Sequence, residues 1–349
     1  MSRRKVVFNV ETECQLMTSL CIIRQFYTPA DEIWIYLMQP EGGSRLKSKL
    51  NFEGLNIKIY YIHFRIKLFL DRELKRKYDE IVKINPDDFY FFLEVTFWIP
   101  YILRKLKKVG TRILLAPDGV NFAGTTWNMK SRIDRYIKTI IYLWSNKMFI
   151  KVPFPGKYYA SNPNIDCVML WDSKSYTNFT NRTIVRYQNF KGNDKELVNL
   201  INNVFCFKDQ IVPLLNTKEV IVWFDQPLYN SEAYLSKLTL LLKTVCLNHE
   251  NRVLIIKTHP HSHKQTIDKL MESFPSAYLI KADYPAELYI ANMRDAILLS
   301  INSMASVFEM DGVKSYWLYP LFPEAFGCQG KINYAPGSFV RVINSIDEI

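Results

Sequence analysis

Three of the five histidines lie within the decapeptide 255–264, IIKTHPHSHK, directly after an apolar run. His259, His261 and His263 occupy alternate positions, and an imidazole can bind a metal ion, transfer a proton or donate a hydrogen bond to a phosphate. Pro260 lacks the N–H of an extended ladder, and no acidic residue or cysteine lies nearby in sequence to complete a metal site. A solvated strand end also fits this pattern. We favour catalysis or phosphate contact through His259, with His261 and His263 as solvated loop residues.

A carboxylate beside a glycine follows another apolar run, in the triplet Pro117-Asp118-Gly119. A tight turn at a strand end would expose the Asp118 carboxylate, which could then take a proton from a substrate hydroxyl. An ordinary Asp-Gly turn explains the same residues without any chemistry. Asp118 is therefore a candidate general base, and Gly119 a candidate contact of the substrate.

Polar residues also follow two further apolar runs, 218–224 and 295–301. They are Asp225, Gln226 and Pro227 after the first run, and Asn302, Ser303 and Ser306 after the second. The segment SMASVFEM (303–310) predicts a helix, whose free N–H groups and nearby hydroxyls would bind a phosphate. A structural S-x-x-E capping box, Ser306 with Glu309, is the alternative. We expect Gln226, Asn302, Ser303 and Ser306 to contact a nucleotide.

The elements that must position these residues alternate apolar runs with helix-like stretches, which predicts an α/β fold. Runs such as VIVWF and VLIIK are typical of parallel strands that are buried on both faces. The expected strands are 5–10, 32–38, 56–64, 88–95, 112–117, 218–224, 252–258, 276–282 and 295–301, with helices after Thr12 and at 231–249 and 264–274. Ligands of such sheets bind beyond the carboxyl ends of the strands, where the candidate residues lie.

A length of 349 residues is enough for two domains. The runs fall into two blocks, and turn-rich sequence between them places the expected boundary near 210–217. We therefore expect an N-terminal Rossmann-like domain, 1–212, and a C-terminal one, 213–349. The first would carry the catalytic base and the second would bind the nucleotide.

The net charge of the chain is +11, and Lys and Arg gather in the segments 65–77, 103–108 and 128–151. The last segment mixes basic residues with Ile, Tyr, Leu, Trp and Phe, as interfacial helices do. A core helix with a solvated basic rim and a surface for anionic membranes both fit this composition. Nucleic acid is not expected as a partner, because no RNP, zinc-finger or helix-turn-helix signature is present.

Several classes of protein are disfavoured by what the sequence lacks. The six cysteines show no C-x-x-C spacing, as expected of free thiols in a reducing compartment. The first apolar run is too short for a signal peptide, and no run of about 18 or more apolar residues could span a bilayer. The absence of D-x-D, P-loop and G-x-G-x-x-G motifs leads us to expect no metal ion and no cofactor.

At these residues the sequence resembles the bacterial sialyltransferases of GT-B fold, above all glycosyltransferase family 52 and the related bacterial polysialyltransferases. The family motifs are an acidic-acidic-Gly triplet, a His-Pro pair and a Ser-Ser/Thr pair, in that order. Here they read Pro117-Asp118-Gly119, His259-Pro260 and Asn302-Ser303, so that a proline replaces the first acid and an asparagine the first serine. Two weaker similarities are VFNVETECQL (7–16), with Thr12 and Gln15, and PAEL (285–288), with Glu287.

The resemblance implies two Rossmann-like domains facing a central cleft and an inverting, metal-independent transferase. The donor would be a CMP-activated sialic acid or a related nonulosonic acid. The acceptor would be a hydroxyl of a cell-surface glycan such as lipooligosaccharide, O-antigen or capsule. Asp118 would be the base, His259 would protonate or hydrogen-bond the leaving phosphate, Ser303 would hold that phosphate, and Glu287 would bind the ribose.

Other functions fit the same residues. One alternative is a GT-B transferase that uses CMP-Kdo or a nucleotide diphosphate sugar. Another is a non-catalytic protein that binds polyanions or membranes through the basic helices. For the enzyme we expect a cytoplasmic location with peripheral attachment to the inner membrane face, because the expected acceptor is lipid-linked or surface glycan.

Overall fold

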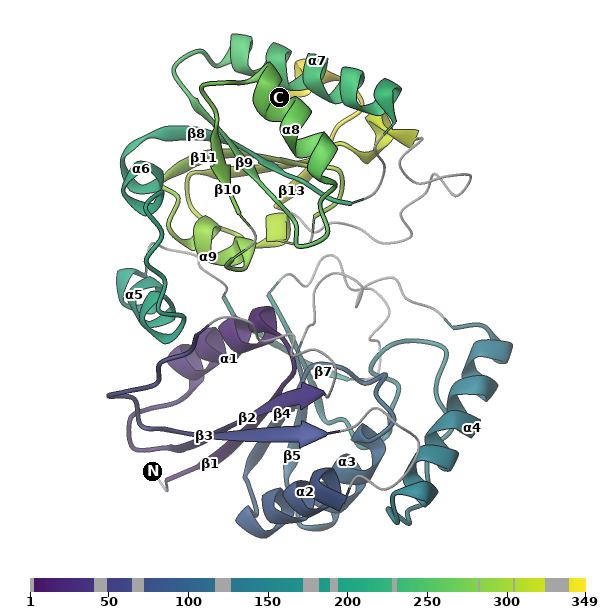
Figure 1. Cartoon of the computed structure of the whole chain (residues 1–349). Helices are drawn as coiled ribbons and strands as arrows, with labels where there is room; N and C mark the ends of the chain where they lie inside the picture. The colour runs from purple at the N-terminus through teal and green to yellow at the C-terminus, as the bar shows by residue number, and fades with distance from the viewer. Residues whose placement is uncertain are drawn as a thin grey trace. The chain divides into compact units, whose positions relative to one another are not determined.

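The computed structural model divides the chain into two compact units, Met1–Gln188 and Asn189–Ile349. It describes residues 3–40, 49–64, 72–116, 127–171, 182–188, 194–227, 231–281, 283–303, 305–323 and 339–349. Each unit contains one parallel sheet with helices on its faces (Figure 1). The two sheets with alternating helices confirm the predicted α/β class with two Rossmann-like units.

The sheet of the first unit has the strand order β3-β2-β1-β4-β5-β6-β7. Its strands are β1 (Lys5–Val10), β2 (Glu32–Pro40), β3 (Ile57–Phe64), β4 (Asp88–Phe91), β5 (Arg112–Leu115), β6 (Cys167–Leu170) and β7 (Thr183–Arg186). Strand β1 lies between β2 and β4, with Val7 opposite Trp34 and Phe89. Five consecutive residues of β1 are buried, because helices cover both faces of the strand.

Helix α1 (Glu13–Phe26) covers one face of this sheet, and α2 (Arg72–Ile84) with α3 (Ile99–Lys108) covers the other (Figure 1). Helix α3 begins with Pro100 in its first turn and ends with three lysines in its last turn. Both features stabilise the helix. Proline fits the first turn, and cations interact favourably with the negative carboxyl end of the helix dipole. Helix α4 (Met129–Ser145) follows β5 at the periphery of the unit.

The sheet of the second unit has the strand order β10-β9-β8-β11-β12-β13. Its strands are β8 (Glu219–Phe224), β9 (Val253–Lys257), β10 (Tyr278–Ile280), β11 (Asp295–Ser300), β12 (Val313–Trp317) and β13 (Val340–Val342). Strands β9 and β10 lie on one side of β8. The later strands β11, β12 and β13 lie on its other side. The strand order therefore reverses between β8 and β11, where such sheets bind ligands.

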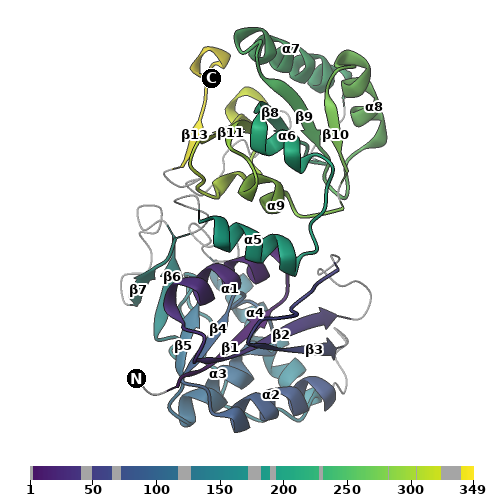
Figure 2. The same ribbon diagram turned by 90° about the vertical axis from the view of Figure 1, so that its left-hand side faces the viewer.

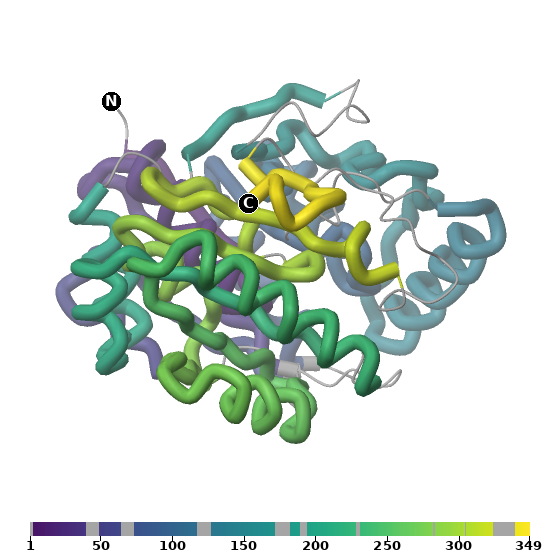
Figure 3. Tube along the Cα trace, turned by 90° about the horizontal axis from the view of Figure 1, so that it is seen from above, coloured from purple at the N-terminus to yellow at the C-terminus, as the bar shows by residue number. Residues whose placement is uncertain are grey.

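The helices of the second unit lie on both faces of its sheet. They are α5 (Lys195–Val204), α6 (Val212–Thr217), α7 (Glu232–Asn248), α8 (Lys264–Ser273) and α9 (Ala286–Ala291), with 3-10 turns η2 (Ala305–Val307), η3 (Tyr319–Leu321) and η5 (Ile346–Glu348). Helices α7 and α8 lie side by side on one face (Figure 3). They cover Trp223 of β8 and Ile256 of β9, which are completely buried.

The second unit begins earlier in the chain than the boundary expected between 212 and 213. Helix α5 lies beside α9 (Figure 2), where the amides of Asn202 and Asn292 exchange two hydrogen bonds of 2.9 and 3.0 Å. The Tyr289 hydroxyl of α9 also donates to Asp209 over 2.6 Å. Segment 195–212 therefore belongs to the packing of the second unit.

Candidate functional site

A pair of amides joins the two strand ends at which the order of the second sheet reverses. Gln226 follows β8 and Asn302 follows β11, and the Gln226 Nε2 donates to Asn302 Oδ1 over 2.9 Å. The Asn302 backbone N–H in turn donates to Gln226 Oε1 over 2.8 Å. The structure thus brings together two residues that the sequence predicted as nucleotide contacts. Within the described residues the side-chain NH₂ of Asn302 makes no hydrogen bond, and this group stays a candidate donor for a ligand.

The turn that carries His259 is anchored to the end of β8. The His259 N–H donates to Ser262 Oγ over 2.8 Å, and the Ser262 N–H donates to the His259 carbonyl over 2.9 Å. The Ser262 hydroxyl donates to Asp225 Oδ2, and the Asp225 N–H donates to the carbonyl of Lys257 in β9 over 3.0 Å. Asp225 therefore fixes the position of the His259 turn through Ser262.

The ring of His259 is oriented by its own turn. Its Nδ1 accepts the backbone N–H of His261 over 3.1 Å, and the two rings are 5.5 Å apart. A neutral imidazole that accepts at Nδ1 carries its proton on Nε2, which is then a donor. His259 is exposed to solvent, and its contact with a phosphate stays a prediction.

The other two histidines have different surroundings. His261 and His263 are exposed, and His263 precedes α8 without a side-chain capping bond. Pro260 is exposed in the same turn as His259. In the described part of the chain no group of three His, Cys, Asp or Glu residues could hold a metal ion.

Asp225 is a site residue to which the sequence analysis assigned no role. It is only 4% exposed, and burial raises the pKa of its carboxyl above the usual range, although the hydrogen bond from Ser262 opposes that rise. Lys257 is equally buried, and its Nζ donates to the carbonyl of Thr258 over 3.1 Å. The signal was present in the sequence, since Asp225 directly follows a buried strand.

The segment after β11 differs from the expected helix. Residues 305–307 form the 3-10 turn η2, and Ser306 is completely buried. The Ser306 hydroxyl donates to the Ser303 carbonyl over 2.6 Å and accepts the Trp317 Nε1–H over 2.7 Å. Ser306 thus has a structural role, and the expected helix N-terminus is replaced by a turn.

Ser303 differs from Ser306 in what its side chain can offer. Its backbone N–H donates to Ser300 Oγ over 3.0 Å, and it is only partly buried. Its hydroxyl makes no hydrogen bond within the described residues, so it remains a candidate phosphate ligand. Glu287 lies in the first turn of α9 and is 8% exposed. Its contact with a ribose stays a prediction.

For the candidate residues of the first unit, the structure gives no arrangement that points to a ligand. Asp118 and Gly119 lie outside the described residues. Thr12 caps α1, where its hydroxyl accepts the Gln15 N–H over 3.2 Å. Gln15 is completely buried, and its Oε1 accepts the Glu11 N–H over 2.7 Å. The start of α1 therefore explains both residues without a ligand.

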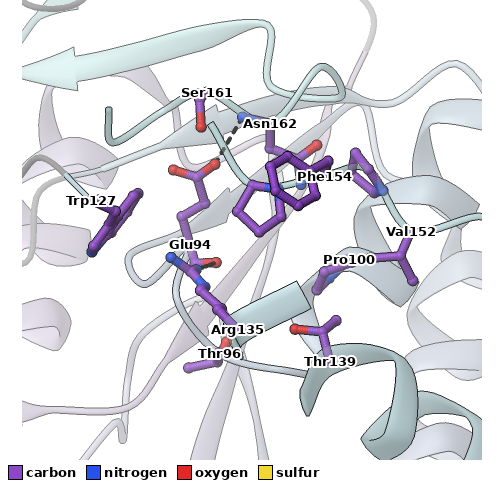
Figure 4. Close-up of a pocket in the computed structure, with 12 residues that line it drawn as sticks. Glu94, Thr96, Pro100, Trp127, Arg135, Thr139, Val152, Phe154, Ser161 and Asn162 are labelled. Atoms are coloured by element: carbon purple, nitrogen blue, oxygen red, sulfur yellow. Dashed lines mark hydrogen bonds between the residues drawn. The ribbon is translucent and has the colours of Figure 1, made fainter. Parts of the chain in front are cut away.

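A small pocket after β4 was not suggested by any motif. Glu94 points toward the loop at Asn162 there, beside Arg135 and Trp127 (Figure 4). The Glu94 carboxylate accepts the N–H groups of Ala160 and Asn162 over 2.5 and 2.8 Å, while burial raises the pKa of this carboxyl. The cavity that these residues line has a volume of about 30 Å³. Glu94 is 7% exposed, and its two hydrogen bonds support the loop.

Known proteins resemble this chain in fold. No family model matches the sequence, and no curated protein matches it. The UDP-GlcNAc 2-epimerase from Methanocaldococcus jannaschii aligns with a TM-score of 0.52 at 10% identity, over 99% of this chain and 90% of that chain. This alignment shows a shared GT-B-like fold.

Two further solved structures have lower TM-scores. A putative UDP-N-acetylglucosamine 2-epimerase from Listeria monocytogenes aligns with a TM-score of 0.46 at 12% identity, over 91% of this chain and 80% of that chain. The ADP-heptose LPS heptosyltransferase II from E. coli aligns with a TM-score of 0.39 at 12% identity, over 97% of this chain and 90% of that one. The alignment with the Methanocaldococcus jannaschii protein is the one that supports the GT-B-like fold, and none of these comparisons supports the resemblance to sialyltransferases.

Proposed function

We propose that this chain is a glycosyltransferase whose second unit binds the nucleotide of an activated sugar at the carboxyl ends of β8, β9 and β11. The observation that carries the proposal is the Gln226–Asn302 amide pair at the reversal of strand order. The ends of β9 and β11 lie on either side of β8, so about two strand spacings, ~10 Å, separate these two strand ends, and side chains beyond them can reach toward each other. That span suits a nucleotide with its phosphate.

Transfer would proceed by one displacement with inversion. The acceptor oxygen bonds to the anomeric carbon as the bond from that carbon to the phosphate oxygen breaks. Asp118 takes the proton of the acceptor hydroxyl. The His259 Nε2–H, the Asn302 NH₂ and the Ser303 hydroxyl hydrogen-bond the departing phosphate, whose charge grows in the transition state. These neutral donors take the place of a metal ion.

Two donor classes fit this site, and different observations favour them. The fold match to a protein named for UDP-GlcNAc favours a nucleotide diphosphate sugar. The His259-Pro260 and Asn302-Ser303 pairs favour a CMP-activated sialic acid or another nonulosonic acid, through the family that they resemble. We place the nucleotide diphosphate sugar first because a match over nearly the whole chain outweighs two dipeptides. The proposed acceptor is a hydroxyl of a lipid-linked or cell-surface glycan.

Thermal denaturation of the full chain with UDP, CMP, GDP or buffer alone tests the proposal. A nucleotide that binds only the folded state raises the melting temperature with its concentration. We expect such a shift with UDP or CMP and a smaller shift in Ser303→Ala. Ser276→Ala, which removes an exposed serine just before β10, is the matched control. If no nucleotide shifts the melting temperature, the non-catalytic alternative replaces the transferase.

A further inference from the structure

Helix α4 presents apolar residues to the protein on one side and to solvent on the other. Thr139, Tyr142 and Leu143 are buried against the first unit. An outer face of charged and polar residues is the norm for such a surface helix. The outer face of α4 departs from that norm, so its composition needs a further explanation.

The exposed stripe of α4 runs along the whole helix. Its residues are Met129, Ile133, Ile137, Ile141 and Trp144, with 57%, 45%, 50%, 47% and 61% of their surfaces exposed. Steps of four and three residues keep these side chains on one side of the helix. Phe149, which follows the helix, is 71% exposed. These six residues, the α4 stripe, are a continuous apolar series and not the scattered apolar residues of an ordinary surface.

The charge around the α4 stripe is almost entirely positive. Segment 127–158 contains seven Lys and Arg residues and one acid, Asp134, which pairs with Lys138 over 2.8 Å. All five lysines of the segment are exposed, namely Lys130, Lys138, Lys147, Lys151 and Lys157. A helix with an apolar stripe and a basic surround matches the interfacial helices that lie in the headgroup region of anionic bilayers.

We propose that the α4 stripe and its surrounding lysines dock the chain on the surface of an anionic lipid bilayer. The stripe would enter the boundary between headgroups and acyl chains, with the lysines against the lipid phosphates. None of the helices in the described residues is long and apolar enough to cross a membrane. This proposal does not rest on the transferase activity.

A second copy of the chain is the competing occupant of the stripe. A twofold contact would place the same patch of each copy against the other. With five exposed lysines and one acid in this segment of each copy, like charges would meet across that contact. Repulsion between them disfavours self-association, whereas anionic phosphates neutralise the same charges.

Binding to vesicles tests the proposal with a matched pair of double variants. Ile137→Asp with Ile141→Asp places two carboxylates in the α4 stripe. Leu240→Asp with Leu247→Asp makes the same change on α7, where both leucines are 67% and 69% exposed. The vesicles are phosphatidylcholine with phosphatidylglycerol, and phosphatidylcholine alone. Co-sedimentation at low salt measures binding, because salt screens the electrostatic part.

We expect the wild type and the α7 variant to bind the anionic vesicles alike, and the α4 variant to bind at least ~10-fold more weakly. Little of the wild type or of either variant should co-sediment with vesicles of phosphatidylcholine alone. Trp144 gives a second readout, since an indole that leaves water shifts its fluorescence to the blue. That shift should disappear in Trp144→Phe while most of the binding remains.

Three outcomes would overturn the proposal. One is no binding of the wild type to anionic vesicles. Another is an equal loss of binding in both double variants. The last is a wild-type dimer, detected by sedimentation velocity, that only the α4 variant disperses. Nucleotide-dependent melting, measured without vesicles, reports on the proposed transferase separately, so failure of one proposal leaves the other intact.

Discussion

At the scale of single residues, the three histidines of the opening decapeptide differ in what orients them. Among the three, His259 is the one whose Nδ1 accepts a backbone N–H in the described structure, that of His261. His259→Ala should therefore weaken nucleotide binding and turnover, each by ~10-fold or more, because a hydrogen bond to a charged group is lost. His261→Ala and His263→Ala should stay near wild type. Calorimetry and initial rates measure the effects, and equal losses in all three variants, with bound metal, would restore a metal site.

Asp118 is proposed as the base, and its test separates chemistry from binding. Asp118→Asn keeps the size and polarity of the side chain and removes the proton acceptor. Positioned bases contribute ~10²–10⁴-fold, so turnover should fall by about that factor while nucleotide affinity is unchanged. Steady-state rates and calorimetry on the same preparations measure both quantities. A variant with wild-type turnover would remove Asp118 from the mechanism.

Asp225 gives a prediction about stability and pH. Because burial raises the pKa of this carboxyl, folding favours its protonated form, and its ionisation costs stability as pH rises through the raised pKa. Asp225→Asn removes that cost, and the amide oxygen of the asparagine can still accept the hydrogen bond from the Ser262 hydroxyl. The variant should melt higher than wild type at neutral pH, and the difference should shrink as pH falls toward the usual Asp range. Thermal melts across this pH range test it, and a pH-independent difference would contradict it.

At the scale of elements, Glu94 holds the loop at 160–162 against the end of β4. Glu94→Ala leaves two buried backbone N–H groups without their acceptor, at ~1–3 kcal/mol for each. Glu250→Ala removes an exposed glutamate and should leave stability nearly unchanged. Urea denaturation of both variants measures the free energy of unfolding. If the two variants unfold alike, the loop does not depend on Glu94.

The strands were predictable, whereas the turn after β11 was not. Runs such as VIVWF become buried parallel strands because their composition suits a strand covered on both faces. Segment 303–310 has helical composition, yet the Ser306 hydroxyl bonds to the Ser303 carbonyl and to Trp317. Side-chain hydrogen bonds of serine compete with helical ones, and Trp317 is distant in sequence. The Glu94 pocket was missed for a similar reason, because its residues come from separate segments.

At the scale of the whole molecule, each unit has its own sheet and its own core. A fragment of residues 189–349 should therefore fold cooperatively and bind the nucleotide. A fragment of residues 213–349 lacks α5 and Asp209, which exposes α9 and removes the partners of Asn292 and Tyr289. We expect the shorter fragment to be less stable in urea. Equal stability of the two fragments would show that segment 189–212 contributes nothing to the second unit.

The Gln226–Asn302 pair also has a consequence for biosynthesis. Its two members are 76 residues apart in sequence, so the pair cannot form before Asn302 has left the ribosome. Such distant pairings form slowly, since a long loop must close first. The first unit can fold while the second is still being translated. A nascent chain released before Asn302 would thus carry a folded first unit and no nucleotide site, because the site needs both Gln226 and Asn302.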